Sequence, residues 1–175
     1  MKQESLNHFI KELSKVWGPL TSDLTKKSKE LVEELTQNCI GESWVDQLLK
    51  EQLPFKEIYR SEEHGFILMG HVEKKGDFSP PHDHGSGWVI YSTVIGQSKM
   101  GLFNRVFHPD GTMDIVQKDD YILNAGECNV YLPGDIHDTY TLEDNTLMLR
   151  LTSCDFLQEL KEGRLVRYTN NHKKW

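Results

Sequence analysis

The chain has 175 residues, of which 27% are charged and 37% hydrophobic, and its formal net charge is −7 at pH 7. This length and composition are typical of one soluble globular domain with a full hydrophobic core. The acidic balance argues against a nucleic-acid-binding protein, which normally presents a basic face. No apolar run approaches the ~18 residues that a membrane-spanning helix needs. Three cysteines without framework spacing, and a first segment that lacks the apolar block of a signal peptide, predict a cytoplasmic protein.

The first fifty residues predict helices. Apolar side chains from Leu6 to Trp17 recur at steps of three and four residues, which gives one apolar stripe. The sequences WGPL and IGESW then interrupt the helical pattern, and Pro54 ends it. We therefore expect residues 1–54 to belong to the same domain as residues 55–175 and to pack outside a β-barrel that the latter form.

From Phe55 onward the chain predicts short β-strands. Runs rich in valine, isoleucine, tyrosine, phenylalanine and threonine are separated by glycine, proline, aspartate and asparagine, as in GFILMGHV, WVIYSTVIG, KMGLFNRVF and TLMLRLT. Many short strands with regular turn signals indicate a β-sandwich or a barrel. The sequence HPDG between two such runs predicts a hairpin turn in which Gly111 has a positive φ.

Two histidines lie one residue apart at the start of one of these runs, in PPHDHGSGWVIYSTVIG. Residues i and i+2 of a strand face the same side, so His82 and His84 point together while Asp83 points away. Neutral imidazoles bind zinc, iron, copper and nickel, so the pair predicts half of a metal site. Taken alone, however, a His-x-His pattern more often marks two surface histidines in a loop.

A wider pattern supports the metal site. The segment GDFSPPHDHGSGWVIYSTVIG and the later segment GECNVYLPGDIH resemble the paired motifs of the cupin superfamily. Those motifs contain a glycine, His-x-His, an acidic ligand and a glycine, and then a glycine, Pro-x-Gly and a final histidine. The second motif departs by one place at Pro133. The resemblance implies a mainly β cupin fold, a double-stranded β-helix or jelly-roll barrel, and a metal bound by His82, His84 and His137.

The cupin acidic ligand falls at Val89, which cannot bind a metal. Three neutral histidines would leave the metal its full +2 charge and open cis positions, as in a catalytic rather than a closed structural site. An anionic chelating substrate would balance that charge. The missing carboxylate favours Fe(II), with zinc, nickel and manganese as alternatives.

Over residues 55–156 the chain resembles the thiol dioxygenases, which are cupins with three histidine ligands, and its core segment resembles that of the cysteine dioxygenases. The resemblance implies a non-haem Fe(II) dioxygenase that binds O₂ and a small anionic, thiol-like or diketone-like substrate. The chain departs from the family on one strand, where Met148, Arg150 and Thr152 occupy the places of a Ser-x-His-x-Tyr run. We therefore expect it to lack ordinary cysteine dioxygenase activity.

Two arginines are candidates for binding the substrate. Arg150 shares a strand face with Met148 and Thr152, and its planar fork would bind a carboxylate if that face lines the cavity. If the leucine face is the core instead, Arg150 is solvated. Arg60 lies near the place of a carboxylate-binding arginine in cysteine dioxygenases; the alternative is an exposed charge at a strand end.

Three aromatic residues are further candidates. Tyr91 and Tyr140 would each donate a hydrogen bond to bound oxygen, and Trp88 would form a wall of the pocket. Packing in the core is the alternative for all three.

Two other classes of function stay open. A cupin of this kind could be an isomerase or lyase that uses zinc, nickel or manganese as a Lewis acid, or a ligand-binding protein without enzyme activity. Metal analysis and oxygen consumption distinguish these from a dioxygenase. In each case we expect a small-molecule ligand rather than a nucleic acid or a membrane, and a monomer or a homodimer.

Overall fold

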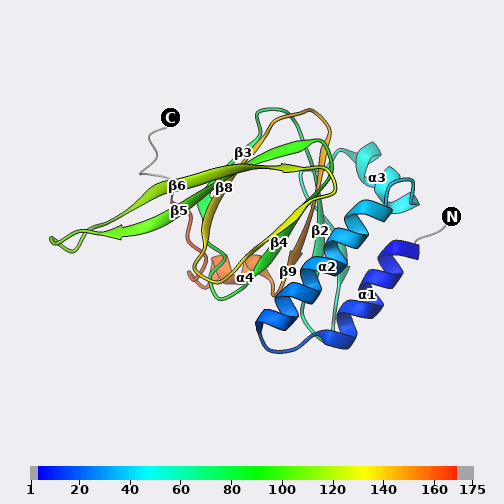
Figure 1. Cartoon of the computed structure of the whole chain (residues 1–175), viewed down its shortest axis with the longest axis horizontal. Helices are drawn as coiled ribbons and strands as arrows, with labels where there is room; N and C mark the ends of the chain where they lie inside the picture. The colour runs from blue at the N-terminus through cyan, green and yellow to red at the C-terminus, as the bar shows by residue number, and fades with distance from the viewer. Residues whose placement is uncertain (1–3, 169–175) are drawn as a thin grey trace.

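The computed structural model of the chain describes residues 4–168. Three helices come first, and the strands of two antiparallel sheets and a short last helix follow (Figure 1). The helices are α1 (Glu4–Val16), α2 (Ser22–Asn38), α3 (Ser43–Glu51) and α4 (Phe156–Lys161). The strands are β1 (Lys56–Arg60), β2 (Ile67–Glu73), β3 (Phe78–His82), β4 (Val89–Ile95), β5 (Gln97–Phe107), β6 (Met113–Asn124), β7 (Cys128–Tyr131), β8 (Ile136–Thr141) and β9 (Thr146–Thr152).

The strand order is that of a jelly roll. One sheet has the order β1-β2-β9-β4-β7, and the other has the order β3-β8-β5-β6. From β2 to β9 the chain thus forms two interlocked Greek keys whose sheets face each other across the core. The mainly β, jelly-roll fold that the sequence predicts is confirmed.

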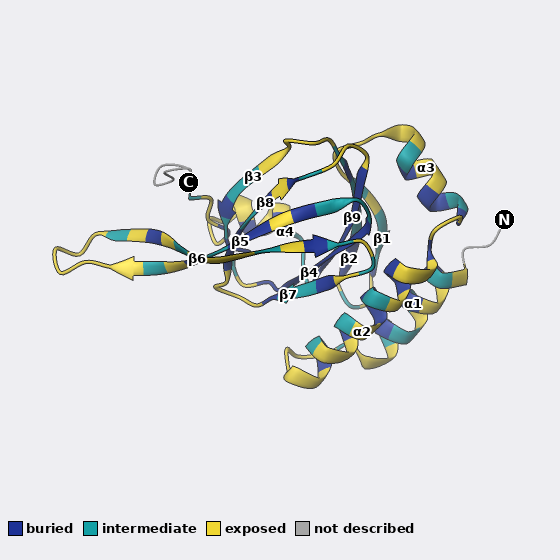
Figure 2. Cartoon of the chain, turned by 45° about the horizontal axis from the view of Figure 1, so that its top comes forward, coloured by how far each residue is buried: buried dark blue, intermediate teal, exposed yellow. Residues whose placement is uncertain are grey.

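The N-terminal helices cover the outer face of the five-stranded sheet (Figures 1 and 2). Along β4, Ile90 and Val94 pack in a cluster with residues of α1, α2 and α3, whereas Val89 and Tyr91 pack in a second cluster between the two sheets. Both faces of β4 are thus buried, and even its two small polar residues, Ser92 and Thr93, are fully buried. None of the described helices is long and apolar enough to cross a membrane.

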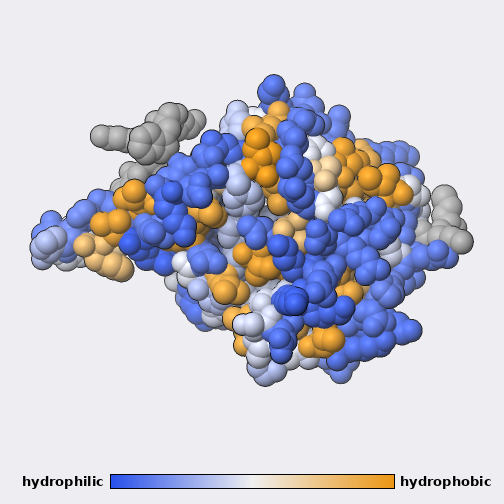
Figure 3. All heavy atoms as spheres, in the orientation of Figure 1, coloured by the Kyte–Doolittle hydropathy of each residue, from blue (hydrophilic) through white to orange (hydrophobic). Residues whose placement is uncertain are grey.

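Strands β5 and β6 form a long hairpin whose tip projects from the body of the molecule (Figure 2). Gly111 in its turn has a φ of 85°, as predicted, and its amide donates a hydrogen bond to the carbonyl of His108. Phe107, beside this turn, is 74% exposed. The face of the molecule seen in Figure 3 is mostly hydrophilic, with separate small apolar areas.

Candidate metal centre

Three histidines that are distant in the sequence meet between the two sheets. His82 ends β3 and pairs in register with His137 on the neighbouring strand β8, and His84 follows two residues after His82. The ligand atoms of the three side chains all lie within 4.8 Å of one another, and the Nε2 atoms of His84 and His137 are 3.2 Å apart. Within residues 4–168, this is the one cluster of three or more histidine, cysteine or acidic side chains that brings its ligand atoms together in this way.

The protonation of these imidazoles suits a metal. Burial lowers the pKa of His82, and it lowers the pKa values of His84 and His137 well below the usual value, so the rings are neutral at neutral pH. The Nδ1 atom of His82 lies 2.8 Å from the carbonyl oxygen of Pro80. Because a carbonyl only accepts hydrogen bonds, Nδ1 carries the proton and Nε2 presents its lone pair toward the cluster. Converging lone pairs of neutral imidazoles form the donor set that divalent transition metals prefer.

Aromatic rings enclose the histidines. Tyr131 stacks on His137 with a centroid distance of 4.1 Å, and Phe156 stacks on His84 at 5.0 Å. Tyr91 meets His137 edge-on at 5.0 Å. The hydroxyl group of Tyr131 lies 2.5 Å from that of Tyr121, and burial raises the pKa values of both phenols, which are therefore neutral. The rings hold the imidazoles in place and keep the surroundings of the ligand atoms apolar.

A cavity of about 260 Å³ gives access to the site. Its lining includes His82, His84 and Tyr91 together with Arg150 and Arg60, so three of the candidates suggested by the sequence meet the ligands there. The remaining lining is partly apolar, from β2, α4 and the segment after α4, and includes Ile67, Met69, Leu157, Leu160 and Leu165.

Three arginines line the cavity, Arg60, Arg150 and Arg167, and they differ in their partners. Arg60 donates hydrogen bonds to Glu57 (2.7 Å from Nη2 to Oε2) and to Asp155 (3.1 Å from Nη1 to Oδ2), so its guanidinium is already neutralised. Arg150 has no ion pair with any residue in the described part of the chain, and its buried Nε has no hydrogen-bond partner there. Its guanidinium carbon lies 5.9 Å from the centre of the Phe156 ring. Arg167 is exposed and likewise has no ion pair within the described residues. Arg150 is therefore one of two cationic groups of the cavity available to an anion, and the one with a buried donor that lacks a partner.

Two candidates lie elsewhere. Trp88 faces the helices, where its ring stacks on Trp17 at a centroid distance of 5.4 Å, because it has the parity of Ile90 rather than that of Tyr91. Tyr140 follows His137 by an odd number of residues, so it lies on the opposite face of β8, and it is 42% exposed. The structure thus corrects both expectations. Neither residue lines the cavity that contains His82 and His84.

Sequence reasoning missed Tyr131 and Phe156. The signal for Tyr131 was its parity on β7, where it pairs with Val89 and so faces the interior. The position of Phe156 depends on how α4 folds back over the barrel, and no local pattern indicates it.

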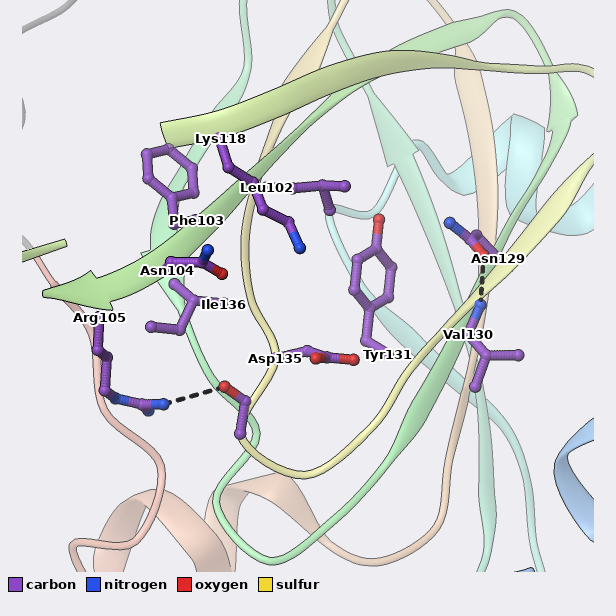
Figure 4. Close-up of a pocket in the computed structure, with 11 residues that line it drawn as sticks. Leu102, Phe103, Asn104, Arg105, Lys118, Asn129, Val130, Tyr131, Asp135 and Ile136 are labelled. Atoms are coloured by element: carbon purple, nitrogen blue, oxygen red, sulfur yellow. Dashed lines mark hydrogen bonds between the residues drawn. The ribbon is translucent and has the colours of Figure 1, made fainter. Parts of the chain in front are cut away.

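A second hollow, of about 370 Å³, lies between the hairpin and the β7–β8 turn. Its lining includes Asn104, Arg105 and Lys118 on the hairpin, and it contains none of the three histidines. Figure 4 shows Tyr131 at its wall and Arg105 reaching the carbonyl oxygen of Gly134. Tyr131 therefore separates this hollow from the histidines.

No protein-family model and no curated protein matches the sequence significantly. Among solved structures, the chain is similar to KdgF from Halomonas sp., with 17% identity and a TM-score of 0.45 over 56% of this chain and 76% of that one. It is also similar to the DMSP lyase DddQ from Ruegeria pomeroyi DSS-3, with 16% identity and a TM-score of 0.46 over 71% of this chain and 55% of that one. An oxalate oxidase in complex with glycolate shows 18% identity and a TM-score of 0.38 over 50% and 41% of the respective chains. The chain spans about half the length, or less, of the last two proteins, and likeness at this level carries no argument about function.

Proposed function

We propose that the protein is a metal-dependent enzyme that binds one divalent metal, Fe(II), through His82, His84 and His137 and oxidises a small anionic substrate with O₂. One observation carries the proposal: Arg150, whose buried Nε has no partner in residues 4–168, lines the same cavity as two of the three converging histidines. A cation beside a neutral ligand set implies that the missing partner is a negatively charged ligand.

The residues of the cavity define how that ligand binds. Arg150 orients a carboxylate through its planar fork, and Tyr91 supplies a hydroxyl group on the wall next to His84. Phe156 and Met69 bury the apolar part of the substrate and exclude water. An iron ion bound by the three histidines would supply the redox chemistry with O₂.

The substrate class is a carboxylate with a second donor, such as a thiol or a diketone, that reaches the metal. L-Cysteine itself is not expected to be turned over at an ordinary rate. Met148 is 1% exposed and its sulfur accepts a hydrogen bond from Ser98 at 3.2 Å, while the hydroxyl of Thr152 faces the carbonyl oxygen of Ile67 at 3.5 Å. Met148 has no proton to donate, and the hydroxyl group of Thr152, which lines the cavity, is directed at a backbone carbonyl.

A non-oxidative reaction is the second candidate, because the hydroxyl group of Tyr91 and the three neutral histidines would also serve a lyase or an isomerase that moves a proton with a metal as Lewis acid. The deciding experiment is metal analysis of protein purified without a tag, followed by oxygen uptake with carboxylate-bearing thiols and diketones. Stoichiometric iron with substrate-dependent oxygen uptake supports the dioxygenase. Zinc, nickel or manganese without oxygen uptake supports the second candidate, and absence of any bound metal contradicts both.

For the cell, we propose a cytoplasmic location, because Cys39, Cys128 and Cys154 are free thiols, as expected in a reducing compartment. We expect the protein to act as a monomer or a homodimer.

A further inference from the structure

The backbone pairing between the two segments that carry the histidines is interrupted. The pairing of β3 with β8 is irregular between Ser79 and His82, so His82 and His137 meet beyond a break in the ladder. His84 lies after the end of β3, in a loop. A metal site needs its ligand atoms held to within a fraction of an ångström, so contacts outside this interrupted ladder contribute to the distance between the two segments.

Asp83, between the two histidines, anchors the first segment. Its side chain points away from the ligand cluster and is buried, with 4% of the residue exposed. Oδ1 accepts hydrogen bonds from the amides of Gly85 at 3.1 Å and Val166 at 2.9 Å. Oδ2 accepts hydrogen bonds from Arg105 at 2.7 Å and from the hydroxyl of Tyr168 at 3.1 Å. The hydrogen bonds of this carboxylate therefore tie the loop between His82 and His84 to β5 and to the C-terminal segment.

Arg105, on β5, connects that carboxylate to the second segment. Its Nη1 donates to the carbonyl oxygen of Gly134, three residues before His137, at 3.0 Å (Figure 4). Its Nη2 donates to Asp83, and its Nε and Nη2 both reach the hydroxyl of Tyr168, at 3.0 and 2.7 Å. One planar group thus contacts the loop of His82 and His84, the turn before His137 and the C-terminal segment.

We propose that Arg105 is a positioning residue that fixes the spacing between the two ligand-bearing segments and thereby sets the affinity of the metal centre. The inference rests on the proposed metal centre. It follows from the geometry of the guanidinium, because a rigid planar fork can hold three acceptors at fixed separations, whereas the donors of a lysine all sit on one nitrogen and cannot span acceptors that are far apart. Loss of a partner outside the ligand set typically weakens metal binding about 10- to 100-fold.

The test measures Co²⁺ binding by the full chain, by competition with a chelator, and records the visible spectrum of the bound Co²⁺. Removing Arg105 alone would leave the Asp83 carboxylate buried and unpaired, so the first variant changes both residues, Asp83→Asn with Arg105→Gln. Asparagine keeps an oxygen for the amides of Gly85 and Val166. The second variant, Arg105→Lys, keeps the charge opposite Asp83 and tests the fork alone.

The matched control is Lys99→Gln with Asp120→Asn, which makes the same kind of change in an ion pair of the same hairpin. This pair has a distance of 2.7 Å, but its side chains are 46% and 42% exposed and it lies away from the histidines. His137→Ala serves as the control for the metal centre itself. Thermal unfolding of the metal-free proteins shows whether each variant folds.

We expect the double variant to bind Co²⁺ about 10- to 100-fold more weakly than the wild type, Arg105→Lys to fall between them, and both to change the Co²⁺ spectrum. The Lys99 and Asp120 control should match the wild type in both measurements. If the double variant fails to fold, Arg105→Lys decides the matter. Wild-type affinity and spectrum in the Arg105 variants, with binding lost in His137→Ala, would overturn the role of Arg105 and leave the metal centre standing. Absence of Co²⁺ binding in the wild type would remove the metal centre and the inference together.

Discussion

Replacing Arg150 with methionine should stabilise the metal-free protein. The Nε–H group of Arg150 is buried and has no acceptor in the described chain, and such an orphaned donor costs about 1–3 kcal/mol. The contact between its guanidinium and the Phe156 ring, at 5.9 Å, offsets about 0.5–1 kcal/mol of that cost. Methionine has a similar unbranched stem and no donor, so it keeps most of the packing.

The difference between these terms predicts that Arg150→Met raises the free energy of unfolding by about 1 kcal/mol. For a protein of this size, that corresponds to a rise in Tm of about 2–4 °C. The assay is thermal unfolding of the chelator-treated protein, followed by circular dichroism and repeated in a denaturant titration. The same variant should lose the binding of carboxylate ligands, because methionine lacks the planar fork that would hold a carboxylate. Such opposite effects on stability and on binding are common for functional residues.

Arg60→Met is the internal control, because Arg60 lines the same cavity but has Glu57 and Asp155 as partners. Its removal should leave stability unchanged or reduce it by up to about 1 kcal/mol, as for other half-exposed ion pairs. A fall in the Tm of Arg150→Met equal to or larger than that of Arg60→Met would refute the reasoning, since it would mean that the Arg150 side chain is already satisfied in the metal-free protein.

Three further predictions concern the metal, the substrate and pH. His137→Ala should abolish metal retention, measured by elemental mass spectrometry, while circular dichroism shows the barrel still folded; unchanged metal content would disprove the ligand assignment. Oxygen uptake with L-cysteine should stay well below the ~1 s⁻¹ of an ordinary enzyme, and a faster rate would show that the replaced Ser-x-His-x-Tyr run is dispensable. Hydrogen bonding to Arg164 lowers the pKa of Glu159 from 4.5 to about 2, so this carboxylate stabilises the fold above pH 4.5 and its contribution is lost as the pH falls toward 2. The Tm of Glu159→Gln should therefore fall less than the Tm of the wild type as the pH is lowered from 5 to 2. An equal fall in Tm for the two proteins would contradict this.

The sequence predicted the parts of the site that depend on local spacing. The sequence brought His82 and His84 together through the period of two along a strand; in the structure only His82 is on β3 and His84 is in the loop after it, yet both reach the cavity. Arg150 reaches the cavity because it alternates with the leucines of β9. The same rule, applied strictly, would have excluded Tyr140 and Trp88, each of which has the wrong parity for the interior.

The rest of the site depends on tertiary paths that a single sequence does not reveal. Phe156 covers His84 because α4 folds back across the cavity. Tyr168 reaches Asp83 because the segment after α4 runs beside the end of β3, where its amide donates to the carbonyl oxygen of Pro81 at 2.8 Å. Nothing in the local sequence near residue 168 records that neighbour, which lies 85 positions away.

The pairing of β2 with β9 has a consequence for the order of events during protein synthesis. Ile67 pairs with Thr152, so the five-stranded sheet cannot be completed until β9, whose Thr152 follows Ile67 by 85 positions, has emerged from the ribosome. The C-terminal segment that holds Asp83 emerges later still. The helices can fold early, whereas β2 and β4 lack their partner until β9 has emerged, and such long-range pairing is slow and leaves strand edges exposed. His137 follows His84 by 53 positions, so the three histidines of the proposed metal centre come together only after β8 has joined its sheet.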